Sequence, residues 1–316
     1  MKYFVFSIIG VMFFFQLIYA EPVLVDQVPR LPEIDTNIAK EAFDRNALVN
    51  HLKATFSQIG SFAFSEQCTQ ENEVYWALCW KEIEDKYYYE LISGDNIDII
   101  TAFDGKRRSV WNKAGIIYTK NGDLPDPRRP TNLPSPLDFY SFLNVNGRYL
   151  NMDELRPDSP AWNNLAARMT YAGHQQFMGH DCIMLRFSGT FNYPMKQYAD
   201  YDVFFDTSTL IPLGWRAYDR QKFMIEQLEA LDFKTITGKA NPSSFTYPSH
   251  CKKTEYQWPG ILTGPNGVVK YYKSVRDEHY DEVEINSLSP EDVQIDRSLV
   301  KAIIDEDSNV VTRLPR

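Results

Sequence analysis

The sequence lacks the short motifs that mark most enzymes. Its 316 residues contain no Gly-x-Ser-x-Gly elbow, no His-Glu-x-x-His pair, no phosphate-binding Walker loop and no Gly-x-Gly-x-x-Gly turn. Asp202 and Asp206 share a face of one expected strand, and they are the pair that a hydrolase would use. No second motif accompanies them, so we expect a non-catalytic protein that needs no cofactor.

Metal-binding patterns are also scarce. His174, His180 and Asp181 flank a tight turn in GHQQFMGHD and offer no helical pairing, which favours surface positions. The acidic run RDEHYDEVEI, residues 276–285, has oxygen ligands for Ca²⁺ but lacks EF-hand spacing. We expect it to be a solvated strand face, and we expect no metal site.

Cysteine is rare, with only four residues, and an even count permits three full pairings. Cys68 and Cys79 flank the polar segment TQENE, which favours adjacent strands. A disulfide between these two is one possibility, and buried free thiols are the other.

Basic residues are outnumbered, since 33 Lys and Arg stand against 42 Asp and Glu, for a net charge of −9. This balance argues against a nucleic-acid partner. The N-terminus carries Lys2, an apolar run that ends at Ala20, and then Glu21 without stop-transfer charges. This pattern predicts a secretory signal peptide cleaved after Ala20, and an exported, periplasmic protein without a transmembrane anchor.

Hydrophobic periodicity predicts a mainly β, α+β protein. One amphipathic helix is expected over residues 35–59. Strand patterns follow, beginning with SFAFSEQC, VYWALCWKEI, KYYYELIS, NIDIITAFD and RSVWNKAG. After a proline-rich insert at 121–136, the strands resume as a meander from MTYAGHQQF onward. We divide the chain into a signal peptide (1–20), an extended leader (21–34), a β-barrel domain (35–260) and a C-terminal extension (261–316).

Alternation along these strands assigns side chains to two faces. Asp202 and Asp206 share a face with Phe204, which we expect to be solvated. The expected inward residues, which would line a concave apolar space and bind a ligand, are Tyr87, Tyr89, Leu91, Ile97, Ile99, Leu185, Phe187, Val203, Phe205, Leu213 and Trp215. The alternative is a completely filled core, which periodicity alone favours.

Two stretches resemble a known superfamily. YYYELISGDNIDIITAFDGKRRSVWNKAG, with Asp104, Gly105 and Trp111, is similar to the early-sheet pattern of the LolA/LolB superfamily of periplasmic lipoprotein carriers and its uncharacterised outer-membrane lipoprotein-sorting relatives. MGHDCIMLRFSG and YDVFFDTSTLIPLGWRAYD, with Leu210 and Pro212 in the turn, resemble its later pattern.

The resemblance implies a strongly curved, unclosed antiparallel β-barrel with helices plugging its mouth and a cavity for acyl chains. It implies a carrier of lipid or of lipoprotein acyl chains. This chain departs from the family in lacking a lipobox cysteine and in having the proline-rich insert and the C-terminal extension. The competing expectation is a structural or interaction module with a filled barrel that docks an envelope protein partner.

Overall fold

The computed structural model describes residues 23–25, 27–35, 37, 43–70, 73–84, 86–93, 96–122, 136–143, 155–159, 162–163, 165–192, 197–238, 244–257 and 271–314. The expected signal peptide and most of the proline-rich insert lie outside these residues. Among the helices described, none is both long enough and apolar enough to cross a membrane.

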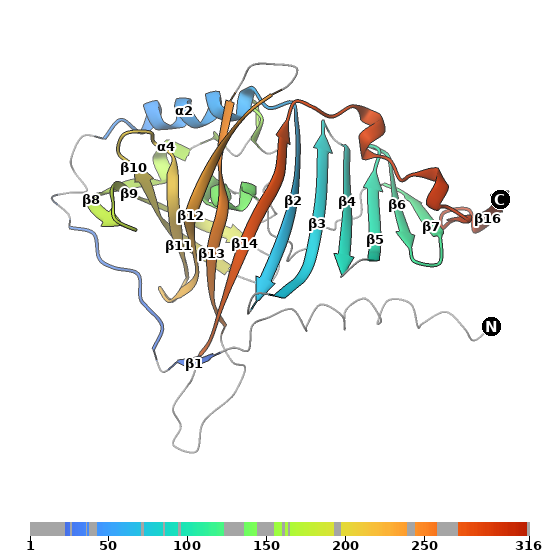
Figure 1. Cartoon of the computed structure of the whole chain (residues 1–316). Coiled ribbons are helices and arrows are strands. Elements are labelled where there is room, and N and C mark those ends of the chain that lie inside the picture. Colours follow the sequence, from blue (N-terminus) through green and yellow to red (C-terminus); the bar gives the residue numbers. More distant parts are fainter. Residues whose placement is uncertain are drawn as a thin grey trace.

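Two antiparallel meanders form most of one large sheet (Figure 1). The first meander consists of β2 (Ser61–Gln70), β3 (Glu73–Ile83), β4 (Lys86–Ser93), β5 (Asn96–Phe103), β6 (Arg107–Asn112) and β7 (Ile116–Asn121). The second consists of β8 (Met169–Phe177), β9 (His180–Asn192), β10 (Gln197–Asp206), β11 (Pro212–Asp219), β12 (Met224–Thr237) and β13 (Ser244–Gln257). Short turns between consecutive strands explain the sequential, antiparallel pairing.

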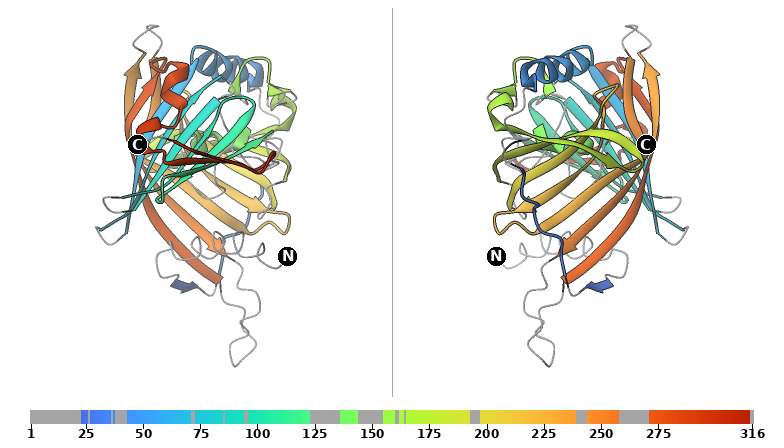
Figure 2. Two further views of the ribbon diagram at one scale, coloured as in Figure 1. Left: turned by 90° about the vertical axis from the view of Figure 1, so that its right-hand side faces the viewer. Right: turned by 90° about the vertical axis from the view of Figure 1, so that its left-hand side faces the viewer.

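The late strand β14 (Tyr271–Ile285) joins the two meanders, because it pairs with β13 on one side and β2 on the other. The division we expected at 260/261 therefore falls between two hydrogen-bonded strands. At the far edge, β15 (Ala302–Asp305) runs parallel to β7 and carries β16 (Val310–Arg313) as its antiparallel neighbour. The described sheet runs from β16 to β8 without closing, and it curves strongly around one side (Figure 2). The mainly β expectation is confirmed.

Helical segments lie against the concave face of the second meander. Helix α2 (Arg45–Ser57) begins at Asp44, whose side chain accepts a hydrogen bond from the Ala47 amide at 2.9 Å. It starts later than we expected, and it buries Leu48, Leu52 and Phe56. The 3-10 helix η2 (Pro136–Leu143) and the short α4 (Leu165–Arg168) complete this layer, with η2 against β11 and β13 and α4 against β9.

The two ends of the chain cover parts of the convex face. In the leader, β1 (Val23–Val25) pairs with β14, and Val28 is buried against Tyr218 and Met224. At the other end, η4 (Pro290–Val293) and η5 (Arg297–Leu299) bring Val293 and Val300 over the apolar outer residues of β4–β7. Both sheet faces of the first meander therefore carry bulky buried groups.

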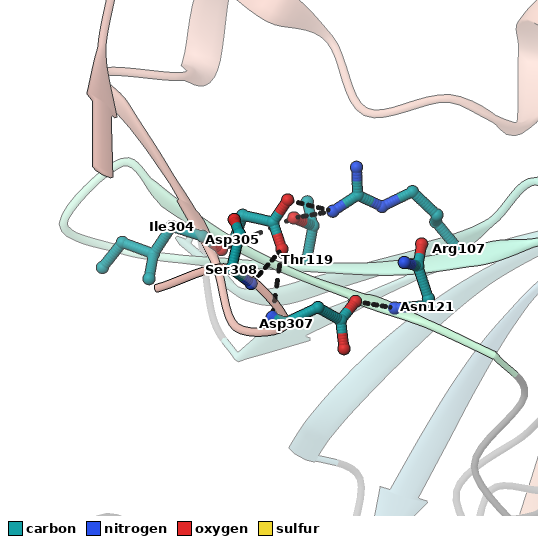
Figure 3. Close-up of polar contacts among 7 residues, drawn as sticks. All are labelled: Arg107, Thr119, Asn121, Ile304, Asp305, Asp307 and Ser308. Atoms are coloured by element: carbon teal, nitrogen blue, oxygen red, sulfur yellow. Dashed lines mark hydrogen bonds and ion pairs between the residues drawn. The ribbon is translucent and has the colours of Figure 1, made fainter. Parts of the chain in front are cut away.

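Polar contacts fasten the β15–β16 hairpin to β6 and β7 (Figure 3). Arg107 forms an ion pair with Asp305 at 2.9 Å and donates to the Thr119 hydroxyl at 2.9 Å. The Asp307 carboxylate accepts a hydrogen bond from the backbone amide of Asn121 at 2.5 Å. The Arg107 guanidinium holds the pKa of the Asp305 carboxyl below its usual range. These contacts fix the C-terminal edge of the sheet.

Candidate functional site

Aromatic rings stack on the concave face of β3–β5. The Trp80 ring lies 5.6 Å from Tyr87 and 5.8 Å from Tyr89, nearly parallel to both, and Phe103 extends the row at 5.6 Å from Tyr87. They meet because they occupy neighbouring register positions on one face. Trp80, Tyr87 and Phe103 are buried, whereas Tyr89 is only half-buried. The stack therefore ends in a partly accessible aromatic surface.

Aliphatic side chains continue this surface on the same face. Leu91 pairs with Ile99, and both are half-buried, as is Val110 on β6. We call Tyr89, Leu91, Ile99 and Val110 the open surface. It consists of apolar groups that keep contact with solvent on the concave side of a curved sheet.

The concave face of the second meander is filled instead. Leu185, Phe187, Val203 and Phe205 are entirely buried, and Trp215 retains 2% of its exposure. The η2 side chain of Phe142 packs on two of them, with ring centroids 4.8 Å from Phe187 and 5.7 Å from Phe205. These buried and packed side chains fit the filled-core alternative for this part of the sheet.

Charged side chains occupy the concave face of β12–β14, at the end away from α2. Lys253 lies 2.6 Å from Glu226 and 4.0 Å from Glu255, between the two carboxylates. On β14, Arg276 donates to Glu278 at 2.7 Å, and the Tyr280 hydroxyl donates to the other oxygen of Glu278 at 2.8 Å. We call Glu226, Lys253, Glu255, Arg276 and Glu278 the charged floor.

Burial makes this floor unusual. Glu278 is fully buried, and Glu226 and Glu255 keep 5% of their exposure or less. Burial is the largest single influence and lowers the Lys253 pKa, but the carboxylates of Glu226, Glu255 and Glu278 together outweigh it and raise the pKa above its ordinary value. Removing such charges from water costs several kcal/mol per ion, in rough terms, unless partners compensate. Compensated charges therefore lie inside an otherwise apolar concavity.

Most of the predicted inward residues lie on the concave face, but two do not. Ile97 packs with the convex cluster under the C-terminal extension, because Asp98 is an extra residue in the register between β4 and β5. Leu213 packs with Phe177 and Phe204 on the convex face, because it is the extra residue between β10 and β11. Each β-bulge reverses the alternation from which the prediction was made.

Phe205 and Trp215 both lie in the concave cluster, and the bulge at Leu213 separates their register positions. Trp215 stands opposite Val203, and Phe205 stands opposite Pro212. Whether any of the predicted lining residues binds a ligand stays a prediction.

Asp202 corrects our expectation of a solvated carboxylate. It is 1% exposed, and both of its oxygens accept hydrogen bonds from Arg186, at 2.6 Å and 2.8 Å. Burial raises the pKa of the Asp202 carboxyl, and Arg186 opposes that rise. Arg186 also donates to the Pro32 carbonyl of the leader at 2.9 Å, so the leader helps to bury the pair. Asp206 does lie at the strand end, where it caps the turn through Ser208 and Thr209.

The structure describes the cysteines and the possible metal ligands in part. Cys79 is a free thiol opposite Ser65, which fits the free-thiol alternative. The Cys68 backbone lies opposite Trp76, and its side chain lies outside the described residues. Within the described part of the chain, no group of three or more His, Cys, Asp or Glu side chains is arranged to hold a metal ion.

Sequence reasoning missed the charged floor. Residues 276–285 were expected to be one solvated face, but Glu278 and Tyr280 point inward and are buried. The available signal was alternation in β13, where Lys253 and Glu255 continue the inward positions of Tyr247 and Cys251. A charged residue at an inward position departs from the apolar pattern of a strand. Periodicity alone does not show which residue on another strand forms an ion pair with it.

Comparisons with known proteins give structural matches only. No protein-family model matches the sequence, and no curated protein matches it. Among solved structures, a DUF1329 family protein from Desulfovibrio piger is 10% identical, with a TM-score of 0.42, and covers 79% of this chain and 98% of its own. An outer-membrane lipoprotein-sorting domain from Vibrio parahaemolyticus is 14% identical, with a TM-score of 0.41 and coverage of 79% and 97%.

A LolA superfamily protein from Nitrosomonas europaea is 11% identical, with a TM-score of 0.41, and covers 80% of this chain and 99% of its own. The chain thus has structural similarity to LolA superfamily proteins at low sequence identity.

Proposed function

We propose that this protein is an exported, non-catalytic binding protein or carrier for a hydrophobic ligand, such as the acyl chains of a lipoprotein or another envelope lipid. The open surface is the observation that carries the proposal. Tyr89 and Leu91 keep partial contact with solvent on the inside of a curved sheet, next to the buried stack of Trp80 and Tyr87. An acyl chain that covered them would remove apolar surface from water, worth about 25 cal/mol for each Å².

The charged floor gives such a ligand a second point of attachment. Between stack and floor on the concave face, Phe64 contacts Tyr280 at a ring distance of 6.1 Å, and Tyr280 bonds Glu278. An amphiphile could place its chain on the open surface and its polar head near Lys253 and Arg276. The catalytic alternative, with Asp202 and Asp206, has little support because Asp202 is held by Arg186 on the convex side.

Native mass spectrometry of protein purified gently from the periplasm tests the proposal, followed by displacement of a fluorescent fatty acid. We expect co-purifying lipid and saturable uptake. Leu91→Glu should weaken uptake at least tenfold, because it puts a charge on the open surface. Ile92→Glu is the matched control, since Ile92 is the next residue on β4 and points to the other face, where its partner is Ile97.

The second candidate is a structural or interaction module that docks an envelope protein. The filled concave face of the second meander favours it, since Phe142 and Trp215 leave no room there. An apo mass, with no fatty-acid uptake by the wild type, would support this module and refute the carrier.

A further inference from the structure

Two histidines face each other at the seam where β14 meets β13. His250 and His279 are direct cross-strand partners, and their rings stack with centroids 4.0 Å apart and planes 19° from parallel. Their neighbours Cys251 and Tyr280 point to the concave core, so alternation places both imidazoles on the convex face. The pair is independent of both the open surface and the charged floor.

The surroundings of the pair favour a cation. Asp277 lies 3.4 Å from Nε2 of His250, and Asp232 is the register partner of His250 on β12. Asp281 forms an ion pair with Lys234 at 3.5 Å, and Lys252 is the other basic neighbour. The neighbourhood of the imidazoles therefore contains three carboxylates and two ammonium groups, so its negative charges outnumber its positive charges. Both histidines are half-buried, so an ion can reach them from solvent.

Imidazole is the commonest metal ligand in proteins, and the geometry of a shared ion limits how two imidazoles can lie around it. In a tetrahedral site with metal–nitrogen distances near 2.0–2.1 Å, two ring nitrogens stand roughly 3.3 Å apart. Because each nitrogen lone pair lies in the plane of its ring, the two rings must turn out of their stack about χ2 before both nitrogens point to one ion. Contact between Asp277 and Nε2 of His250 leaves Nδ1 for the metal, with the carboxylate orienting the ring.

We propose that His250 and His279 form a binding site for a divalent transition metal of the Zn²⁺ class, with water completing the coordination. Two protein ligands make this a labile site that exchanges with its surroundings. The position of this site would let a bound metal affect stability, because β14 is the strand that connects the two meanders. A metal held by both strands ties this junction, and binding to the folded state raises its stability with metal concentration.

Zinc titration of the metal-free protein at pH 7.5, followed by calorimetry and by the thermal midpoint, tests the site. We expect one Zn²⁺ per chain and a thermal midpoint that rises with Zn²⁺ and returns on adding a chelator. His250→Gln and His279→Gln should each weaken binding at least tenfold. The imidazole signals of these two residues should shift in NMR spectra of the wild type, which reports the ligands without any substitution.

The chain offers a matched control in His174 and His180, which lie on the β8–β9 hairpin. Replacing both with Gln should leave the affinity and stoichiometry unchanged. If that double variant loses binding instead, or if Zn²⁺ still binds His250→Gln as tightly as wild type, the assignment to β13 and β14 is wrong.

Discussion

The two meanders of this sheet are built alike but filled differently on their concave faces. In the second meander, η2 and α4 cover the strands, and residues such as Leu185 are fully buried. In the first, the stack around Trp80 is buried while Tyr89 and Leu91 keep part of their exposure. The same strand pattern therefore serves as a core in one half and as a partly open apolar surface in the other.

The convex faces of the two meanders are covered by opposite ends of the chain. The first meander is covered outside by the C-terminal extension, whereas the second is covered in part by the N-terminal leader. Neither covering element belongs to the meander that it covers. A residue's burial in this fold thus depends on chain segments that lie far away in the sequence.

One substitution made in both halves tests the comparison most directly, and it has the largest expected effect. Leu185→Ala should lower the free energy of unfolding by about 3–4 kcal/mol, because the surrounding core cannot close over the lost volume. Leu91→Ala should cost only about 1 kcal/mol, since its side chain is half exposed before the change. Equilibrium unfolding in urea gives both values. Equal losses would mean that the first meander is as filled as the second, and the open surface would not exist.

The buried pair on the convex side gives the next largest effect. Asp202→Asn should cost about 3 kcal/mol, because the amide leaves the buried guanidinium of Arg186 without its counter-charge. Arg186 would then also hold the Pro32 carbonyl less firmly, so proteolysis of the leader should become faster.

Asp200→Asn is the control for that change. Asp200 lies two residues earlier on β10, is half-buried and accepts a hydrogen bond from Ser188 at 2.6 Å. Its replacement should cost about 0.5–1 kcal/mol. A silent Asp202→Asn would show that the leader does not bury this pair in solution.

Sequence alternation predicted the concave positions of residues such as Val203 and Trp215, because strand geometry is local and its period is two. It failed at Ile97 and Leu213, where one inserted residue reverses the faces without changing the composition of the strand. The expectation that Asp202 is exposed to solvent failed for a different reason. The segment that helps to bury this carboxylate begins more than 150 positions earlier in the chain, and no local pattern reports that contact.

The candidate site divides in the same way. The stacked rings follow from local strand patterns with bulky residues at alternate positions, whereas the charged floor depends on pairing between β12, β13 and β14. Lys253 and Glu278 look like ordinary surface charges until their partners are placed. The sequence indicates the strands of this site, but it does not indicate which strands lie beside one another.

The smallest expected effect concerns the outer edge of the first meander. Arg107→Gln removes the ion pair with Asp305 and the hydrogen bond to Thr119, both of which are partly exposed, so global stability should change little. The β15–β16 hairpin should instead open locally, and the amides of residues 302–305 should lose protection in hydrogen exchange at pH 7.

The same ion pair makes the hairpin sensitive to pH. Because Arg107 lowers the pKa of Asp305, the stabilising contribution of the pair is present above the unfolded carboxyl pKa of about 3.9. This contribution disappears as the pH falls through the lower folded pKa. The wild-type hairpin should therefore approach the protection factors of the variant once the pH lies below the folded pKa of Asp305, whereas amides of β4 should match in both proteins throughout. A uniform loss of protection across β4 to β7 would show that the hairpin supports the whole meander rather than its edge.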